Sequence, residues 1–235
     1  MDIYVSAAHE GWALLVSGTL DIWTIVATSL RVSGLAAAIS LVIGLPLGLL
    51  VGLRHFVGRR IVLIIFNSGL GLPPVFVGLL VAMTLSRRGP LGEMGLLYSQ
   101  TAMIISQLII ATPIVTAIAA GAVSAVPKQL RQQARSLGAQ GWRVALLTIK
   151  EARMGLIAAV AGGFGQIISE IGASQMVGGN LAGDTRVMTT AIAEFTRKGQ
   201  YGSGLALALI LISLVVFVNV VLTTMQTSAD RWERQ

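Results

Sequence analysis

The chain has 235 residues, of which 54% are hydrophobic and 11% are charged, and its mean hydropathy is +0.80. Because a soluble domain carries about a quarter charged residues, this composition excludes an ordinary soluble protein and predicts a membrane protein. The absence of cysteine excludes disulfides and thiolate metal sites, and we attribute the net charge of +7 to basic loops that orient a membrane protein, not to nucleic-acid binding.

The N-terminal region is mixed in character. It begins MDIYVSAAHEG, which lacks the basic start of a cleavable signal peptide, so none is expected. Residues 12–30 combine apolar side chains with Asp21, and Arg31 follows directly. We predict an amphipathic helix that lies near the membrane surface or extends the first span, with a sixth span as the alternative.

Five segments are long and apolar enough to cross a bilayer, which takes roughly 20 residues in a helix. They cover approximately residues 33–53, 61–85, 101–123, 154–173 and 204–224. The sequence therefore predicts an all-α, polytopic membrane protein, with residues 1–235 forming a single transmembrane domain.

Two of these segments carry signs of irregular packing. The second is interrupted by GLGLPP at residues 69–74, which predicts a broken helix. Backbone groups freed by a break need partners in protein or a wet cavity, so the break indicates either a structural kink or part of a translocation path. The fourth is rich in small residues that allow close helix contact: Gly155, Ala159, Gly162, Gly163 and Gly165.

Lysine and arginine counts in the loops predict the orientation, because cytoplasmic loops are the more basic. The loops after the first, third and fifth spans hold eleven of these residues: Arg54, Arg59, Arg60, Lys128, Arg131, Arg135, Arg143, Lys150, Arg153, Arg231 and Arg234. The opposite face holds five: Arg87, Arg88, Arg186, Arg197 and Lys198. We expect the N-terminus outside and the C-terminus in the cytoplasm.

The cytoplasmic loop at residues 127–153 reads PKQLRQQARSLGAQGWRVALLTIKEAR. Pro127 suits the first position of a helix, and Leu130, Ala134 and Leu137 recur at helical spacing. Gly138 stands where a helix end favours positive φ. Such a helix either lies on the lipid surface or forms a short protruding contact surface for a partner protein.

This helix resembles the "EAA" signature of the permease subunits of ATP-binding-cassette importers, Glu-Ala-Ala-x-x-x-Gly followed by an Ile-x-Leu-Pro element. Ala134, Leu137, Gly138 and Ala139 fit that pattern. The chain departs from it at Gln132 and Gln133, which replace the glutamate and first alanine, and at Thr148, Lys150 and Glu151 in the downstream element.

A second stretch, from Phe164 onward, resembles the oxyanion permeases of the same class. Their "SE-x-G-A", "GGN" and "TR-x-x-T-x-A-I" runs correspond to residues 169–173, 178–180 and 185–192. The combination, with the KEAR run at 150–153, is similar to the tungstate-type branch of the molybdate and sulfate permeases. The resemblance covers roughly residues 20–225.

The resemblance implies a non-catalytic permease subunit in a bacterial or archaeal plasma membrane, which passes a tetrahedral oxyanion. The chain has no Gly-Lys pair and hence no Walker A phosphate loop, so we expect ATP to be used by a partner. The implied partners are an ATPase subunit in two copies, an extracytoplasmic anion-binding protein and a second copy of this chain. The residues expected to couple to the ATPase are Leu130, Gln132, Gln133, Ala134, Arg135, Leu137 and Gly138.

The anion path is expected to involve Arg186, together with Asn180, Thr185 and Ser169. A guanidinium offers a planar fork that matches an oxyanion, and hydroxyl and amide groups can hydrogen-bond the anion without trapping it. The alternative is that Arg186 pairs with Asp184 or Glu194 and only braces its loop.

Three other classes are weighed. A self-contained secondary transporter of a small anion would use an intramembrane carboxylate, for which Glu170 is the main candidate; otherwise Glu170 caps or pairs near the end of the fourth span. A serine protease at Ser174 needs a base, but the histidines are His9 and His55, both outside the spans. A metal enzyme lacks clustered ligands.

Overall fold

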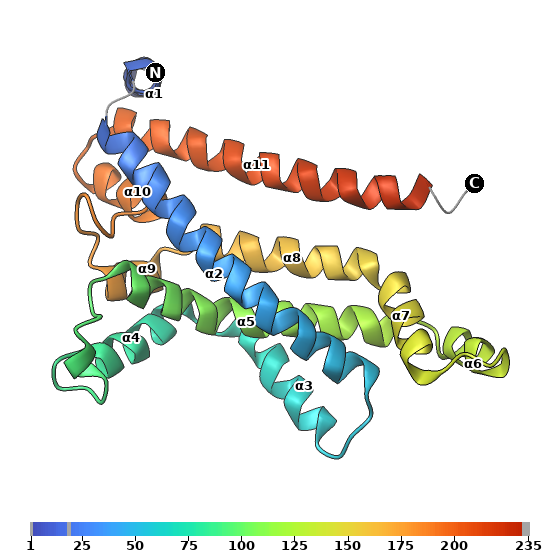
Figure 1. The fold of residues 1–235 in the computed structure, drawn as a ribbon. Helices are drawn as coiled ribbons and strands as arrows, with labels where there is room; N and C mark the ends of the chain where they lie inside the picture. The colour runs from blue at the N-terminus through green and yellow to red at the C-terminus, as the bar shows by residue number, and fades with distance from the viewer. Residues whose placement is uncertain (1, 18–19, 232–235) are drawn as a thin grey trace. The chain divides into compact units, whose positions relative to one another are not determined.

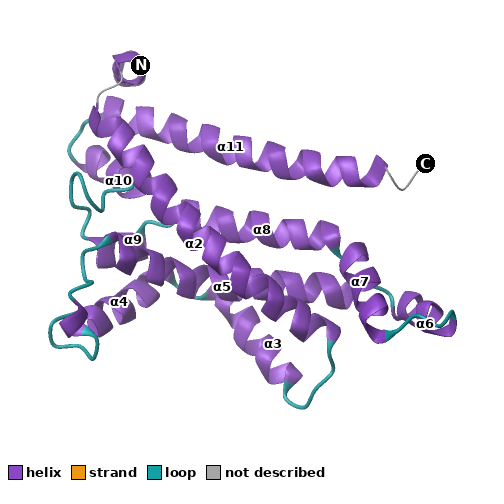
Figure 2. Ribbon diagram, viewed as in Figure 1, coloured by secondary structure: helices purple, strands orange, loops and turns teal. Residues whose placement is uncertain are grey.

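The computed structural model describes residues 2–17 and 20–231, and the described residues form helices and loops without a strand (Figures 1 and 2). The predicted all-α class is confirmed. The helices in chain order are α1 Asp2–Ser17, α2 Leu20–Leu53, α3 Arg59–Ser68, α4 Pro74–Leu85, α5 Gln100–Ala125, α6 Lys128–Ser136, α7 Gly141–Glu151, α8 Arg153–Ile168, α9 Gly172–Gly178, α10 Met188–Arg197 and α11 Tyr201–Arg231, with short 3₁₀ turns η1 Gly69–Gly71 and η2 Gly92–Met94.

The helices that can cross a membrane agree with the predicted spans. In the part of the chain that the structure describes, three single helices are long and apolar enough, over Asp21–Leu53, Gln100–Ala125 and Tyr201–Thr224. Two bent pairs, Arg59–Gly71 with Pro74–Leu85 and Arg153–Ile168 with Gly172–Gly178, bring the number to five if each pair is one span. Residues 20–30 continue into α2, so this part of the N-terminal stretch extends the first span, whereas residues 12–17 belong to α1.

The break in the second span follows from its two prolines. Leu72 and Pro73 both have extended backbone, with ψ of 121° and 118°. Each precedes a proline, whose ring disfavours the helical conformation of the residue before it. Pro74 then begins α4, where its missing N–H costs nothing.

The predicted fourth span, residues 154–173, is bent in the structure: α8 ends at Ile168 and α9 begins at Gly172. Glu170 is buried, and its Oε1 accepts a hydrogen bond of 2.8 Å from the N–H of Ala173. This carboxylate satisfies a free donor at the start of α9, so the chain begins a new helix instead of continuing the old one.

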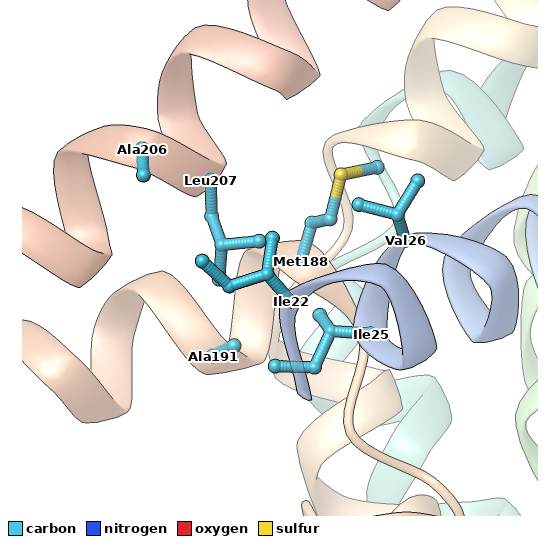
Figure 3. Packing of buried hydrophobic residues seen from close by; sticks show 7 residues of the cluster. All are labelled: Ile22, Ile25, Val26, Met188, Ala191, Ala206 and Leu207. Carbon is cyan, nitrogen blue, oxygen red and sulfur yellow. The ribbon is translucent and has the colours of Figure 1, made fainter. Parts of the chain in front are cut away.

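The described chain falls into two compact units. Unit 1 comprises Met1–Ala36, Pro73–Ile109 and Gly165–Val221, and unit 2 comprises Ala37–Leu72, Ile110–Phe164 and Leu222–Gln235. In unit 1, side chains from α2, α10 and α11 form one apolar core, with Met188 and Leu207 almost fully buried (Figure 3). The assignment of residues 1–235 to one membrane domain stays a prediction.

Unit 2 depends on close contact between the second half of α2 and α5. Gly44, Gly48 and Gly52 lie one turn apart on α2, and a Cβ atom at Gly48 would lie 2.6 Å from the Cβ of Ala119. Cβ atoms at Gly44 and Gly52 would likewise lie 2.9 and 2.7 Å from valine side chains of α5. Small residues let helix backbones approach where apolar burial gives no drive.

Candidate functional site

The helix expected to couple to a partner is α6, in unit 2. It begins at Lys128, one residue later than predicted, and Pro127 is its N-cap with ψ of 134°. The helix is short and bears charged and amide side chains along most of its length.

The end of α6 has a defined geometry. Gly138 has φ of +83°. Its N–H donates to the carbonyl of Arg135 at 3.0 Å, and the N–H of Ala139 donates to the carbonyl of Ala134 at 3.0 Å. These two bonds form a Schellman motif, in which a residue with positive φ closes a helix. The predicted stop at Gly138 is confirmed.

The predicted coupling residues do not share one face of α6. Leu130 packs against the unit 2 core of Val123, Val126 and Ala152, so it belongs to the interior. Leu137 is 88% exposed. The other coupling residues lie as follows: Gln132, Gln133, Arg135 and Gly138 are exposed, and Ala134 is half-buried. The surface that α6 offers is therefore polar, with Leu137 at its end.

Arg131 of α6 and Arg59 of α3 both bind near the ends of the membrane helices α2 and α5. Arg131 donates through Nη2 to the carbonyl of Val123 at 2.6 Å, near the end of α5. Arg59 donates to the carbonyl of Val51 at 2.8 Å, near the end of α2, and to Oγ of Ser124 at 2.9 Å. Cations complete helix C-termini because the last carbonyls have no partner within the helix. The sequence showed these residues only as positive charge, and this anchoring role was missed.

The second predicted site is the loop that follows α9 in unit 1. Gly179 and Asn180 have positive φ, +70° and +53°. The carbonyl of Leu181 then accepts N–H bonds from residues 184, 185 and 186 at 3.2, 3.1 and 3.0 Å. Thr185 is fully buried, and its hydroxyl accepts from the N–H of Leu181 at 2.9 Å and donates to the carbonyl of Gly178. Thr185 thus holds the loop together and presents no free hydroxyl.

Arg186 and Asn180 are brought together by this loop. Nη2 of Arg186 donates to the carbonyl oxygen of Asn180 at 3.3 Å. Nε of Arg186 and Oδ1 of Asn180 are buried and have no hydrogen-bond partner among the described residues. A buried polar atom without a partner costs about 1–3 kcal/mol, and such an atom at a guanidinium is a free donor for an anion.

Arg186 makes no ion pair with Asp184 or Glu194 within the described residues. Glu194 is bound by Arg197 at 2.7 Å and by Lys198 at 2.9 Å. The hydrogen bond from Lys198, with the nearby positive charges, that of Arg186 included, lowers the pKa of Glu194 despite some opposing desolvation. The carboxylate of Glu194 is therefore already paired with two cations at the end of its own helix, α10.

Ser169 lies apart from this loop in its bonding. Its hydroxyl donates to the carbonyl of Gly165 at 2.7 Å, in the last turn of α8, and its side chain is exposed. The described hydrogen bonds join Ser169 to its own helix and not to Asn180 or Arg186.

A buried polar cluster surrounds Glu170 in unit 1. Gln107 donates to Oγ of Ser174 at 3.3 Å, and Thr189 donates to the carbonyl of Glu170 at 2.9 Å. Ser29 accepts the N–H of Met188 at 2.7 Å. A cavity of about 10 Å³ lies among these residues, about the size that one water molecule needs. The sequence signal for this cluster, hydroxyls at residues 29 and 33 on one face of an apolar helix, was missed.

The cluster bears on the other function classes. Ser174 is bonded to Gln107, an amide and not a base. Glu170 caps α9, the structural role that the sequence allowed. Within residues 2–17 and 20–231, no group of three histidines, cysteines or carboxylates is placed to hold a metal ion.

Comparison with known proteins shows that the chain is similar to membrane components of transport systems. Residues 44–235 match the sequence profile of the family described as "Binding-protein-dependent transport system inner membrane component". The chain is 38% identical over 226 residues to a tungstate uptake system permease protein, TupB, of Peptoclostridium acidaminophilum, covering 96% of this chain and 99% of the relative. It is 43% identical over 201 residues to a probable anion ABC transporter permease of Haloferax volcanii, covering 83% and 87%.

More distant similarities extend the same pattern. The chain is 29% identical over 208 residues to the molybdenum transport permease ModB of Escherichia coli, covering 83% of this chain and 91% of the relative. Among solved structures, an inward-facing MetNI methionine ABC transporter is 18% identical, with a TM-score of 0.69, covering 93% of this chain and 97% of the other. At that identity the likeness establishes the fold.

Proposed function

The chain belongs to the family of binding-protein-dependent transport system inner membrane components, and we propose that it is the permease subunit of an importer for a tetrahedral oxyanion. Tungstate is the first candidate, and molybdate and sulfate follow. The observation that carries this proposal is the similarity to a tungstate permease over nearly the whole of both chains.

Energy for transport comes from a partner ATPase in this proposal, and α6 is the contact. The helix is anchored to the end of α5 by Arg131, so a displacement of α6 is transmitted to that membrane helix. The exposed side chains of α6 and its end, Gln132, Gln133 and Leu137, suit a shallow groove on the ATPase. Such a groove would hydrogen-bond the two glutamines at one end and bury Leu137 in an apolar pocket at the other.

The anion passes the loop 179–187, where Arg186 offers a buried guanidinium N–H without a protein acceptor. A donor of this kind binds a dianion by charge-assisted hydrogen bonds, and a single arginine holds it weakly enough to release it. Thr185 positions the loop from within, and Asn180 supplies the carbonyl that orients the guanidinium. Ser169 lies at the end of α8 as a later contact on the path.

The remaining partners follow from the same family. An extracytoplasmic binding protein delivers the anion, and two copies of this chain with two ATPase subunits form the path, because one bundle of five spans is small for an enclosed one. The excess of basic residues around α6 supports an orientation with that side in the cytoplasm and the N-terminus outside.

Competition in cells tests the choice of anion. The chain is expressed with a candidate ATPase subunit and a candidate binding protein, in a host without high-affinity oxyanion uptake, and tungsten accumulation is measured. We expect accumulation that excess molybdate reduces more than excess sulfate does. Accumulation that depends on the chain but is abolished by equimolar sulfate would replace tungstate with sulfate as the cargo.

A further inference from the structure

Unit 2 contains a basic pocket that the proposed transport path does not use. The pocket has a volume of about 410 Å³ and is lined by the basic side chains Arg59, Lys128, Arg131 and Arg135, with His55 beside them. The first comes from the start of α3 and the next three from α6.

The charge of the basic pocket is not balanced within its surroundings. None of its lining residues is acidic, and Glu151 is the one carboxylate in residues 37–72 and 110–164 of the sequence. In addition, Nε of Arg131 is buried and has no hydrogen-bond partner among the described residues. Cations held this close attract an anion by focusing their field, and the unpaired N–H offers it a donor.

An apolar groove adjoins the basic pocket. It has a volume of about 620 Å³, and Leu53, Arg131 and Arg135 line both spaces. Its walls are aliphatic for the most part, from Leu49 and Leu50 of α2 to Ile149 of α7, and Trp142 lies at its edge. Two adjoining spaces thus place several cations beside a long apolar surface.

The position of this site along the helices matches a membrane surface. The basic pocket is bounded by Gly52 and Leu53 at the end of α2 and by Ser124 at the end of α5. Both helices are long and apolar enough to span a membrane, so their ends lie at the depth of the lipid headgroups. Tryptophan is enriched at that depth, which agrees with the place of Trp142.

We propose that this site binds one anionic phospholipid, with the phosphate in the basic pocket and an acyl chain in the apolar groove. A free oxyanion would leave the apolar groove unfilled, and a neutral lipid would leave the charge of the four cations unbalanced. The bound lipid neutralises the basic side chains of α6 that line the pocket. It also contacts α2, α6 and α7, so it stiffens the part of the permease that contacts the ATPase.

Native mass spectrometry of the purified full chain tests the proposal, with dioleoyl phosphatidylglycerol and dioleoyl phosphatidylcholine as probes. Lys128→Gln with Arg135→Gln removes two exposed pocket cations. Arg60→Gln with Lys150→Gln removes two exposed cations of the same unit that do not line the pocket or the groove. Since a basic residue near an anionic surface contributes about 1 kcal/mol, the pocket variant should bind phosphatidylglycerol about tenfold or more weakly, and the control should match the unaltered chain.

A second pair of measurements separates the lipid from other ligands. Ala145→Trp fills the apolar groove and should weaken phosphatidylglycerol binding while leaving glycerol phosphate binding unchanged. Equal losses in the pocket variant and its control would overturn the proposal. So would tungstate or inorganic phosphate that saturates the pocket and displaces the lipid, or a pocket variant that keeps its lipid but loses the ATPase. Lipid binding is measured without transport, so its failure is distinct from failure of the importer function.

Discussion

Arg186 carries the most specific chemistry predicted at a single residue. Its guanidinium is oriented by the carbonyl of Asn180 and keeps a buried N–H without an acceptor among the described residues. The nearby cations Arg197 and Lys198 are instead committed to Glu194. Arg186 thus keeps an N–H available for an anion, whereas one arginine and one lysine stabilise the end of α10.

Arg186→Gln should lower oxyanion uptake about tenfold or more, because a hydrogen bond to a charged group is worth about 1.5–3 kcal/mol. Uptake by the assembled transporter is the measurement. Arg197→Gln is the matched control, since Lys198 still neutralises Glu194 and uptake should be retained. Equal uptake by both variants at low and high salt would remove Arg186 from the path.

Single residues differ in how far the sequence predicts them. Gly138 was predictable because a positive φ at a helix end favours glycine, a requirement that is local to the chain. Thr185 was predicted to face the anion but is fully buried in its loop. Its environment depends on how residues 178–186 close on themselves, which spacing alone does not reveal.

At the scale of the element, Gly138→Val should disturb the end of α6. A β-branched residue in the left-handed region costs about 1–2 kcal/mol or more, so the Schellman closure should fray and transport should fall. Membrane insertion and ATPase binding are measured alongside uptake. Gly141→Ala is the control, because its Cβ meets open space and its backbone has no positive φ. Full uptake with Gly138→Val would show that the closure is not needed for coupling.

The contact of α2 with α5 gives a second prediction. Gly48→Leu should destabilise the protein by about 1–3 kcal/mol, because its Cβ would lie 2.6 Å from Ala119 and 2.8 Å from the carbonyl oxygen of Thr116. Thermal unfolding in detergent measures the change. Gly121→Ala, which meets nothing within 4 Å, should leave the melting temperature as it is. Equal melting temperatures for the two variants would contradict the close contact.

The elements themselves were largely predictable, because length and hydropathy suffice to find a span. The break at residues 72–73 was also predictable from the two prolines. The break after Ile168 was missed because it depends on Glu170 capping a new helix, and in the sequence Glu170 is only a polar residue near the end of an apolar run. The anchoring of α6 was missed for a similar reason: Arg131 binds the carbonyl of Val123 near the end of α5, and in the sequence Arg131 is only a positive charge in a loop.

At the scale of the whole molecule, the orientation in the membrane is the first expectation to test. The chain has no cysteine, so single cysteines can be introduced without background. Val57→Cys and Leu137→Cys, both at exposed positions, should react only with reagent that reaches the cytoplasm, and Met94→Cys only from outside. Labelling of residue 137 from outside would place α6 on the wrong side for an ATPase.

The central claim is that this chain carries an oxyanion only when a partner ATPase drives it. The most direct measurement is tungstate uptake into proteoliposomes that contain the chain alone, or the chain with its ATPase and binding protein. We predict uptake only in the complete system and only with ATP in the compartment that α6 faces. Uptake by the chain alone, driven by a proton or sodium gradient, would contradict the account and identify a secondary transporter.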